Sequence, residues 1–131
     1  MAYAGTVDVS YSGVDYTANV NFSNDVMEVN LISPEILKGL CLEVTKEEIS
    51  VKNESFNFGY DKDVISDFCP ITYLYDVLLA VNEQKPTFIQ QNEILFAEFS
   101  VENHRCEVSF DKATKKLIEV RYDKYVYNFK A

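Results

Sequence analysis

The sequence predicts an α+β domain built mainly from antiparallel β-strands, about ten of them, with one main helix at residues ~67–84. Apolar and polar side chains alternate along most of the chain, and polar turn residues separate the alternating runs. Only the one stretch places apolar residues at helical spacing. The 131 residues are predicted to form a single domain, 1–131, which is long enough to bury its own core.

The first third of the chain is predicted to be a meander of antiparallel strands. Apolar side chains recur at every second position in three runs: Val7, Val9 and Tyr11; Tyr16, Ala18, Val20 and Phe22; Met27, Val29 and Leu31. The pairs Ser12-Gly13 and Asn24-Asp25 separate these runs as turns. One apolar face per strand is typical of an antiparallel sheet whose other face lies in water.

The stretch ISPEILKGLCL, residues 32–42, interrupts the alternation with one helix-like turn. Ser33 can cap a helix, Pro34 suits its first position, and Gly39 suits a left-handed exit. Only one turn fits between these signals. We therefore expect Ile36 and Leu37 to lie on a corner of the chain, folded over a sheet edge or over the end of a barrel.

The main helix is predicted within VISDFCPITYLYDVLLAVNEQKP, residues 64–86. One helical stripe contains Ile71, Leu74, Leu78 and Val81. Pro70 suits the start of the helix, and Pro86 prevents its continuation. Because this segment is apolar on more than one side, we expect the helix to be well buried.

The same alternation predicts the remaining strands, which are short and separated by polar turns. They lie at residues 40–44, 49–52, 56–60, 87–91, 94–101, 104–110, 116–122 and 125–129.

The composition excludes some partners. Twelve basic and 21 acidic residues give a formal charge of −9, which repels phosphate backbones and anionic lipid headgroups, so nucleic acid is not expected as a partner. No apolar run approaches the ~20 residues that span a bilayer. The first residues, MAYAGTVDV, have neither the basic region nor the apolar region of a signal peptide.

No set of residues indicates a reaction, a cofactor or a metal site. His104 is the only histidine, and no serine or cysteine nucleophile is tied to it in the sequence. Asp61, Asp63 and Asp67 are close together, but the loop lacks the glycine and the distal glutamate of a calcium-binding loop. We therefore expect no catalytic residues, no metal ligands and no cofactor, and hence a protein that is not an enzyme.

The three cysteines, Cys41, Cys69 and Cys106, are widely spaced and contain no metal-binding motif. Cys106 follows a strand alternation and is expected to behave as a small buried apolar residue. At most one disulfide can form, and the sequence leaves open whether one does.

Two segments of the sequence resemble a known family. They are the corner ISPEILKGLCLEV, with Pro34, Leu37 and Gly39, and the late hairpin FDKATKKLIEVRY, with Asp111, Thr114, Leu117 and Ile118. This order of strands, corner, helix and hairpin resembles the LolA/LolB-like superfamily of lipoprotein localisation factors, especially its small lipoproteins in Gram-positive bacteria.

The resemblance implies an unclosed antiparallel β-barrel, or half-barrel, whose strands wrap around the main helix. It also implies a non-catalytic role, because carriers of this family bind acyl chains. We therefore expect an extracytoplasmic binding protein that holds an acyl chain or another apolar ligand between the curved sheet and a helical lid. An upstream lipidated cysteine would anchor the full-length protein to a membrane.

The candidate ligand-binding residues are those that alternation, helical spacing and the corner place on apolar faces: Tyr11, Phe22, Leu31, Ile36, Leu37, Leu74, Leu78 and Tyr122. The alternative is that these side chains fill a solid core. The protein would then be a surface interaction module that binds a partner protein, for example one of the cell envelope, or a glycan. The volume of the cavity distinguishes the carrier from the interaction module, since a carrier of a drug-sized ligand needs ~300 Å³ or more.

Overall fold

The structure is a computed structural model and describes residues 3–11, 14–33, 35, 38–52, 57–61 and 71–130. Within these residues it contains one helix and eleven strands, all in one sheet. The elements are β1 Tyr3–Tyr11, β2 Val14–Ser23, β3 Val26–Ser33, β4 Cys41–Val44, β5 Glu48–Lys52, β6 Asn57–Asp61, α2 Ile71–Gln84, β7 Ile89–Gln91, β8 Ile94–Val101, β9 His104–Asp111, β10 Leu117–Tyr122 and β11 Tyr125–Lys130.

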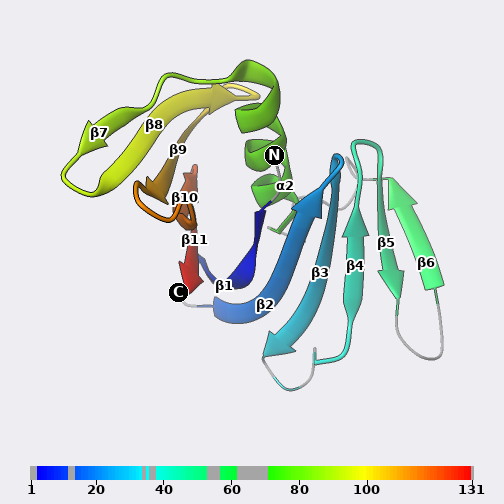
Figure 1. Ribbon diagram of the computed structural model, residues 1–131. Helices are drawn as coiled ribbons and strands as arrows, with labels where there is room; N and C mark the ends of the chain where they lie inside the picture. Colours follow the sequence, from blue (N-terminus) through cyan, green and yellow to red (C-terminus); the bar gives the residue numbers. More distant parts are fainter. Residues whose placement is uncertain are drawn as a thin grey trace.

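The sheet is antiparallel and open. Its strand order is β6-β5-β4-β3-β2-β1-β11-β10-β9-β8-β7, so the first and last strands of the chain pair in the middle and β6 and β7 form the two edges. The sheet curves from one edge to the other, and α2 lies on its concave side (Figure 1). This confirms the predicted mainly antiparallel half-barrel around one helix. The helix is described from Ile71 onwards, so the predicted start at about residue 67 lies outside the described residues.

Most turns lie where polar residues predicted them. Asn24 and Asp25, between β2 and β3, have φ angles of 52° and 62°, and short polar side chains tolerate this left-handed region. Gly39 has a φ of 93°, as predicted for its exit from the corner, and its amide donates to the Leu31 carbonyl at 3.2 Å. The expected positions of Ile36 and Leu37 lie outside the described residues.

The core lies between α2 and the concave face of the sheet. Leu74, Tyr75 and Leu78 of α2 are fully buried, together with inward-facing side chains of most strands. Polar contacts also attach the helix to turns of the sheet. The Tyr75 hydroxyl donates to the Asp25 carbonyl at 2.7 Å, and Lys46 Nζ lies 3.0 Å from Glu83 Oε1. The helix position is therefore fixed both by apolar packing and by contacts with two turns.

Among the described residues, no helix has both the length and the apolar character needed to cross a membrane. Of the cysteines in the described part of the chain, Cys106 is buried and Cys41 is half-buried, and both are free thiols. The burial of Cys106 confirms its prediction as a small apolar core residue.

Candidate ligand pocket

An open pocket of about 670 Å³ lies on the concave side, where α2 ends. Helix α2, the segment after it, the inner faces of β1, β8 and β9, and the turn after β9 form its walls. The lining residues are Tyr3, Val81, Asn82, Lys85, Pro86, Phe88, Leu95, Phe110 and Lys115. The volume falls within the roughly 300–1,000 Å³ of small-molecule sites.

The end of α2 forms one wall. Val81, Asn82 and Lys85 lie on one helix face because they are separated by about one turn or less. The Lys85 amide donates to the Val81 carbonyl at 3.2 Å, and Lys85 takes a φ of 49°, which ends the helix. Pro86 cannot continue it. The chain then leaves the helix over the inner face of β8 towards β7 (Figure 1), which brings Phe88 to the pocket.

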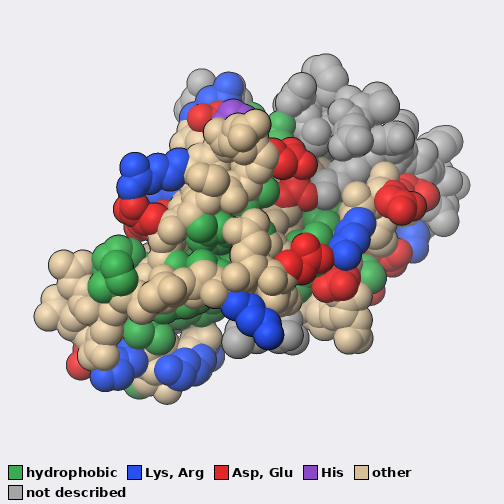
Figure 2. All heavy atoms as spheres, turned by 90° about the horizontal axis from the view of Figure 1, so that it is seen from above, with side chains coloured by type: hydrophobic (Ala, Val, Ile, Leu, Met, Phe, Trp, Pro, Cys, Tyr) green, Lys and Arg blue, Asp and Glu red, His purple; other side chains and the backbone are tan. Residues whose placement is uncertain are grey.

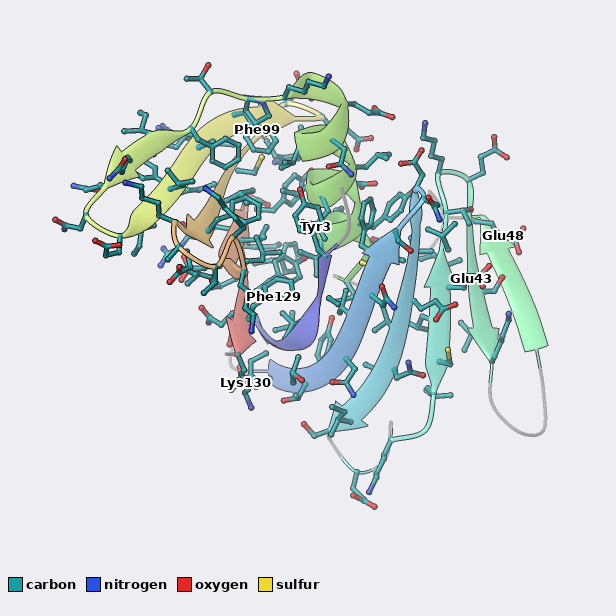
Figure 3. The ribbon with its side chains drawn as sticks, in the orientation of Figure 1. Tyr3, Glu43, Glu48, Phe99, Phe129 and Lys130 are labelled. Carbon is teal, nitrogen blue, oxygen red and sulfur yellow. The ribbon has the colours of Figure 1, made fainter. Side chains whose placement is uncertain are left out.

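The sheet supplies an aromatic floor. Leu95 of β8 lies opposite Phe110 of β9 in the strand register, so both side chains point to the inner face. The rings of Tyr3 and Phe110 are 5.8 Å apart, and those of Phe88 and Phe110 are 5.4 Å apart. Tyr3 and Phe110 are buried, whereas Phe88 and Leu95 are half-buried. Figure 3 shows Tyr3 directed between α2 and the strands that face it.

Few polar groups face the pocket. The Tyr3 hydroxyl donates to Asn82 Oδ1 at 3.3 Å, and burial raises the pKa of Tyr3, so the phenol stays neutral at physiological pH. The other polar lining groups are Lys85 and Lys115, whose side chains are exposed. In the described part of the chain no three His, Cys, Asp or Glu side chains are grouped as metal ligands. This geometry suits the binding of an apolar group.

A second, smaller hollow of about 310 Å³ is lined by Arg105, Arg121 and three neighbours. Each arginine already forms an ion pair, Arg105 with Glu98 and Arg121 with Glu119. Because these charges are neutralised locally, the hollow offers less to a ligand than the apolar pocket.

None of the described residues that the sequence predicted as ligand contacts lines the pocket. Leu74 and Leu78 are fully buried in α2. Phe22 is one layer behind the floor, with its ring 5.9 Å from that of Tyr3. Leu31 is half-buried and packs against the core.

The other predicted residues lie away from the pocket or outside the described part. Tyr122 is buried, with its ring stacked 5.0 Å from Tyr73 near the start of α2. Tyr11 is described only as a backbone position in β1. Ile36 and Leu37 lie outside the described residues.

Sequence reasoning did not single out Tyr3, Val81, Phe88, Leu95 or Phe110 as ligand contacts. One signal could have found Val81, since it follows Leu78 on the same helical stripe and stands shortly before the helix-ending proline. The residues of the sheet carried no such signal.

The protein thus has the fold of an open antiparallel half-barrel with a helix on its concave side and an apolar pocket at the end of that helix. No family model and no curated protein matches the sequence. Solved structures do match. An uncharacterized conserved protein from Thermus thermophilus is 10% identical with a TM-score of 0.57, and the match covers 98% of this chain and 76% of that chain.

Two further structures are similar. One is the CwlD amidase from Clostridioides difficile in complex with the GerS lipoprotein, matched at 15% identity and a TM-score of 0.54 over 92% of this chain and 74% of that chain. The other is the LolA superfamily protein NE2245 from Nitrosomonas europaea, at 6% identity and a TM-score of 0.42 over 99% and 83% of the two chains.

Proposed function

We propose that the protein is a non-catalytic, extracytoplasmic binding protein that holds an acyl chain or a similar apolar group in the pocket at the end of α2. The observation that carries this proposal is the apolar, aromatic-floored space of about 670 Å³, which exceeds the ~300 Å³ that a drug-sized ligand needs. Contacts between core residues on both sides support the walls, so the site is formed before the ligand arrives.

The affinity on this proposal comes from apolar burial. Each methylene that leaves water contributes about 0.8 kcal/mol, so ten of them contribute roughly 8 kcal/mol. Lost freedom of motion on association opposes this by about 4 kcal/mol or more. At most about 4 kcal/mol then remains, so the expected dissociation constant for ten buried methylenes is about 1 mM at best, and each further buried methylene lowers it. Such a site discriminates by chain length more than by detailed shape.

Native mass spectrometry of the folded protein tests the proposal. The spectrum is recorded before and after incubation with a mixed lipid extract, and circular dichroism confirms the fold. We expect a retained mass of one acyl-bearing molecule per chain. A ligand-free mass in both spectra, from folded protein, would contradict the proposal.

The proposed location outside the cytoplasm includes a lipid anchor upstream of this domain. A similar structure contains a lipoprotein, GerS, which supports this part of the proposal. Fractionation of cells that produce the full-length protein, followed by protease treatment of intact cells, tests it. Recovery in the membrane fraction and digestion from outside are expected, whereas a protected cytoplasmic protein would contradict it.

A second candidate function is the docking of a partner protein on the β7–β8 hairpin. Ile89 and Ile94 are 57% and 41% exposed, and the register places them with Phe96 on the outer face of the hairpin. Strand β7 is an edge strand with no charged residue, which permits pairing with another strand. Apolar side chains are visible at this end of the molecule (Figure 2). The similar structure of an amidase with a lipoprotein also favours a protein partner.

The substitution Ile94→Lys separates the two functions. It should weaken capture of a partner from the cell envelope, because it places a charge on the outer apolar surface. It should leave lipid uptake unchanged, because Ile94 does not line the pocket. Unchanged capture would argue against the hairpin as a docking site.

A further inference from the structure

We infer that the pocket binds single-chain amphiphiles with an anionic head, whose charge is held at the pocket mouth by Lys85 and Lys115. This inference rests on the proposed function and specifies the chemical class of its ligand. The apolar chain would occupy the space over Phe88, Leu95 and Phe110, with the head group at the two ammonium groups.

The charged side chains at the pocket are positive, although the protein as a whole is negative. The chain has 21 acidic and 12 basic side chains, yet among the described residues the charged ones that line the pocket are two lysines and no carboxylate. The lysines come from different elements, Lys85 from the end of α2 and Lys115 from the turn between β9 and β10. Two elements therefore bring positive charge to one opening.

These two lysines carry charge that is available to a ligand. Within the described residues, neither has a carboxylate within ion-pair distance. Other lysines do: Lys46 lies 3.0 Å from Glu83, and Lys130 lies 3.4 Å from Asp8. A lysine that is already ion-paired offers less to an anion than a lysine beside the pocket that has no carboxylate in contact with it among the described residues.

The two lysines also share an uncommon backbone conformation. Lys85 and Lys115 have φ angles of 49° and 63°, in the left-handed region that favours glycine or asparagine. The other described non-glycine residues with positive φ are Asn, Asp or Glu, namely Asn24, Asp25, Asn92, Glu102, Asn103 and Asp123. The two lysines in this conformation are thus both residues of the pocket.

Electrostatics limits the effect to the immediate surroundings. The net charge of −9 opposes an anion at long range, but salt screens interactions beyond about 8 Å at physiological ionic strength. The head group therefore interacts mainly with the nearest charges. An exposed ion pair contributes about 1.4-fold to fivefold in affinity, so two lysines contribute between about twofold and twenty-five-fold.

The test compares ligands that have the same alkyl chain and different head groups. Binding of dodecanoate, dodecyl phosphate and dodecanol, and of inorganic phosphate alone, is measured by titration calorimetry at low and high salt. We expect the two anionic amphiphiles to bind about tenfold more tightly than dodecanol at low salt. Most of that advantage should be lost in about 0.5 M salt, where the Debye length falls to ~4 Å. Inorganic phosphate should not bind, because it brings no chain.

The double variant Lys85→Gln/Lys115→Gln should lose the preference for the anions, measured within the variant as the ratio of its affinities for dodecanoate and dodecanol. The matched control is Lys116→Gln, an exposed lysine beside Lys115 that does not line the pocket, and it should keep the preference. Equal affinity for dodecanoate and dodecanol, or an undiminished preference in the double variant, would overturn the inference while leaving the proposed function intact. Binding of inorganic phosphate as tight as that of dodecyl phosphate would overturn it as well. Failure of all three amphiphiles to bind would overturn both.

Discussion

The substitution Leu95→Glu is the sharpest test of the pocket as an apolar site. Leu95 is half-buried on the inner face of β8, opposite Phe110, and lines the pocket. A glutamate there removes a leucine contact with the ligand and places a carboxylate against its chain. In the free protein the pocket is open to water, so the carboxylate remains hydrated and the fold should survive.

The expected loss of affinity follows from these two effects. Full burial of a leucine is worth about 1.5–3 kcal/mol, so a half-buried one contributes about 1 kcal/mol. A polar group that loses its water without a partner costs about 2 kcal/mol. The sum of about 3 kcal/mol corresponds to a loss of roughly a hundredfold in affinity. Dodecanol is the ligand of choice, because its neutral head is not repelled by the new charge.

The matched control is Phe96→Glu at the next residue of the same strand. Phe96 is also half-buried, but it points to the outer face, opposite Ser109. Titration calorimetry should give an affinity within about twofold of the wild type for this variant. Circular dichroism melting curves establish that both variants are folded. Equal affinities of folded Leu95→Glu and wild type, or equal losses in both variants, would refute the placement of the ligand.

Three further predictions concern the core. Tyr75→Phe removes a hydroxyl that donates to the Asp25 carbonyl at 2.7 Å, so urea denaturation should show a stability loss of about 1 kcal/mol; no change would show that the bond is not formed. Burial raises the pKa of Tyr75 and Tyr122 to about 12. Because tyrosines of the unfolded chain ionise near pH 10, the contribution of these two buried tyrosines to stability should be constant below that pH and fall from about pH 10 to 12, less steeply in Tyr75→Phe; a flat profile from pH 10 to 12 would contradict this. Burial raises the pKa of Cys106 to about 11, so its thiol should resist alkylation at about pH 8 until the protein unfolds. Peptide mass spectrometry maps the labelled cysteines, and labelling of Cys106 in the folded protein would contradict its burial.

The sequence predicted the features that depend on neighbours along the chain. The alternation of Val7, Val9 and their counterparts predicted strands because side chains on one face of a strand recur every two residues. Asn24 and Asp25 predicted a turn because their side chains tolerate positive φ. Pro86 predicted the end of α2 because it lacks an amide proton and clashes with a preceding turn. Each of these signals is local.

The pocket could not be predicted in this way because distant segments form it. Tyr3 donates to Asn82, which is 79 residues away in the chain, and its ring packs against Phe110. Alternation shows that a side chain faces the concave side but does not distinguish a core residue from a pocket wall. Phe22 and Leu78 satisfy the same kind of pattern as Leu95, yet both are fully buried and Leu95 is not.

The positive charge at the pocket could not be predicted from the sequence either. A net charge of −9 argues against anionic ligands, and nothing in the order of residues shows that Lys85 and Lys115 line the same space. Their meeting depends on where α2 ends and on how the β9–β10 turn is placed. The Lys115 amide donates to the Asp111 carbonyl at 2.8 Å, which closes this turn.

Methyl NMR spectroscopy of the protein, titrated with dodecanoate, tests the central claim most directly. The methyl signals of Val81 and Leu95 report on the pocket, those of Ile89 and Ile94 on the outer face of the hairpin, and those of Val29 on the core far from both. We predict saturable shifts of the Val81 and Leu95 methyl signals, with the signals of Ile89, Ile94 and Val29 nearly unchanged. Shifts confined to Ile89 and Ile94, or no shifts at a concentration that saturates binding, would contradict the placement of an apolar ligand at the end of α2.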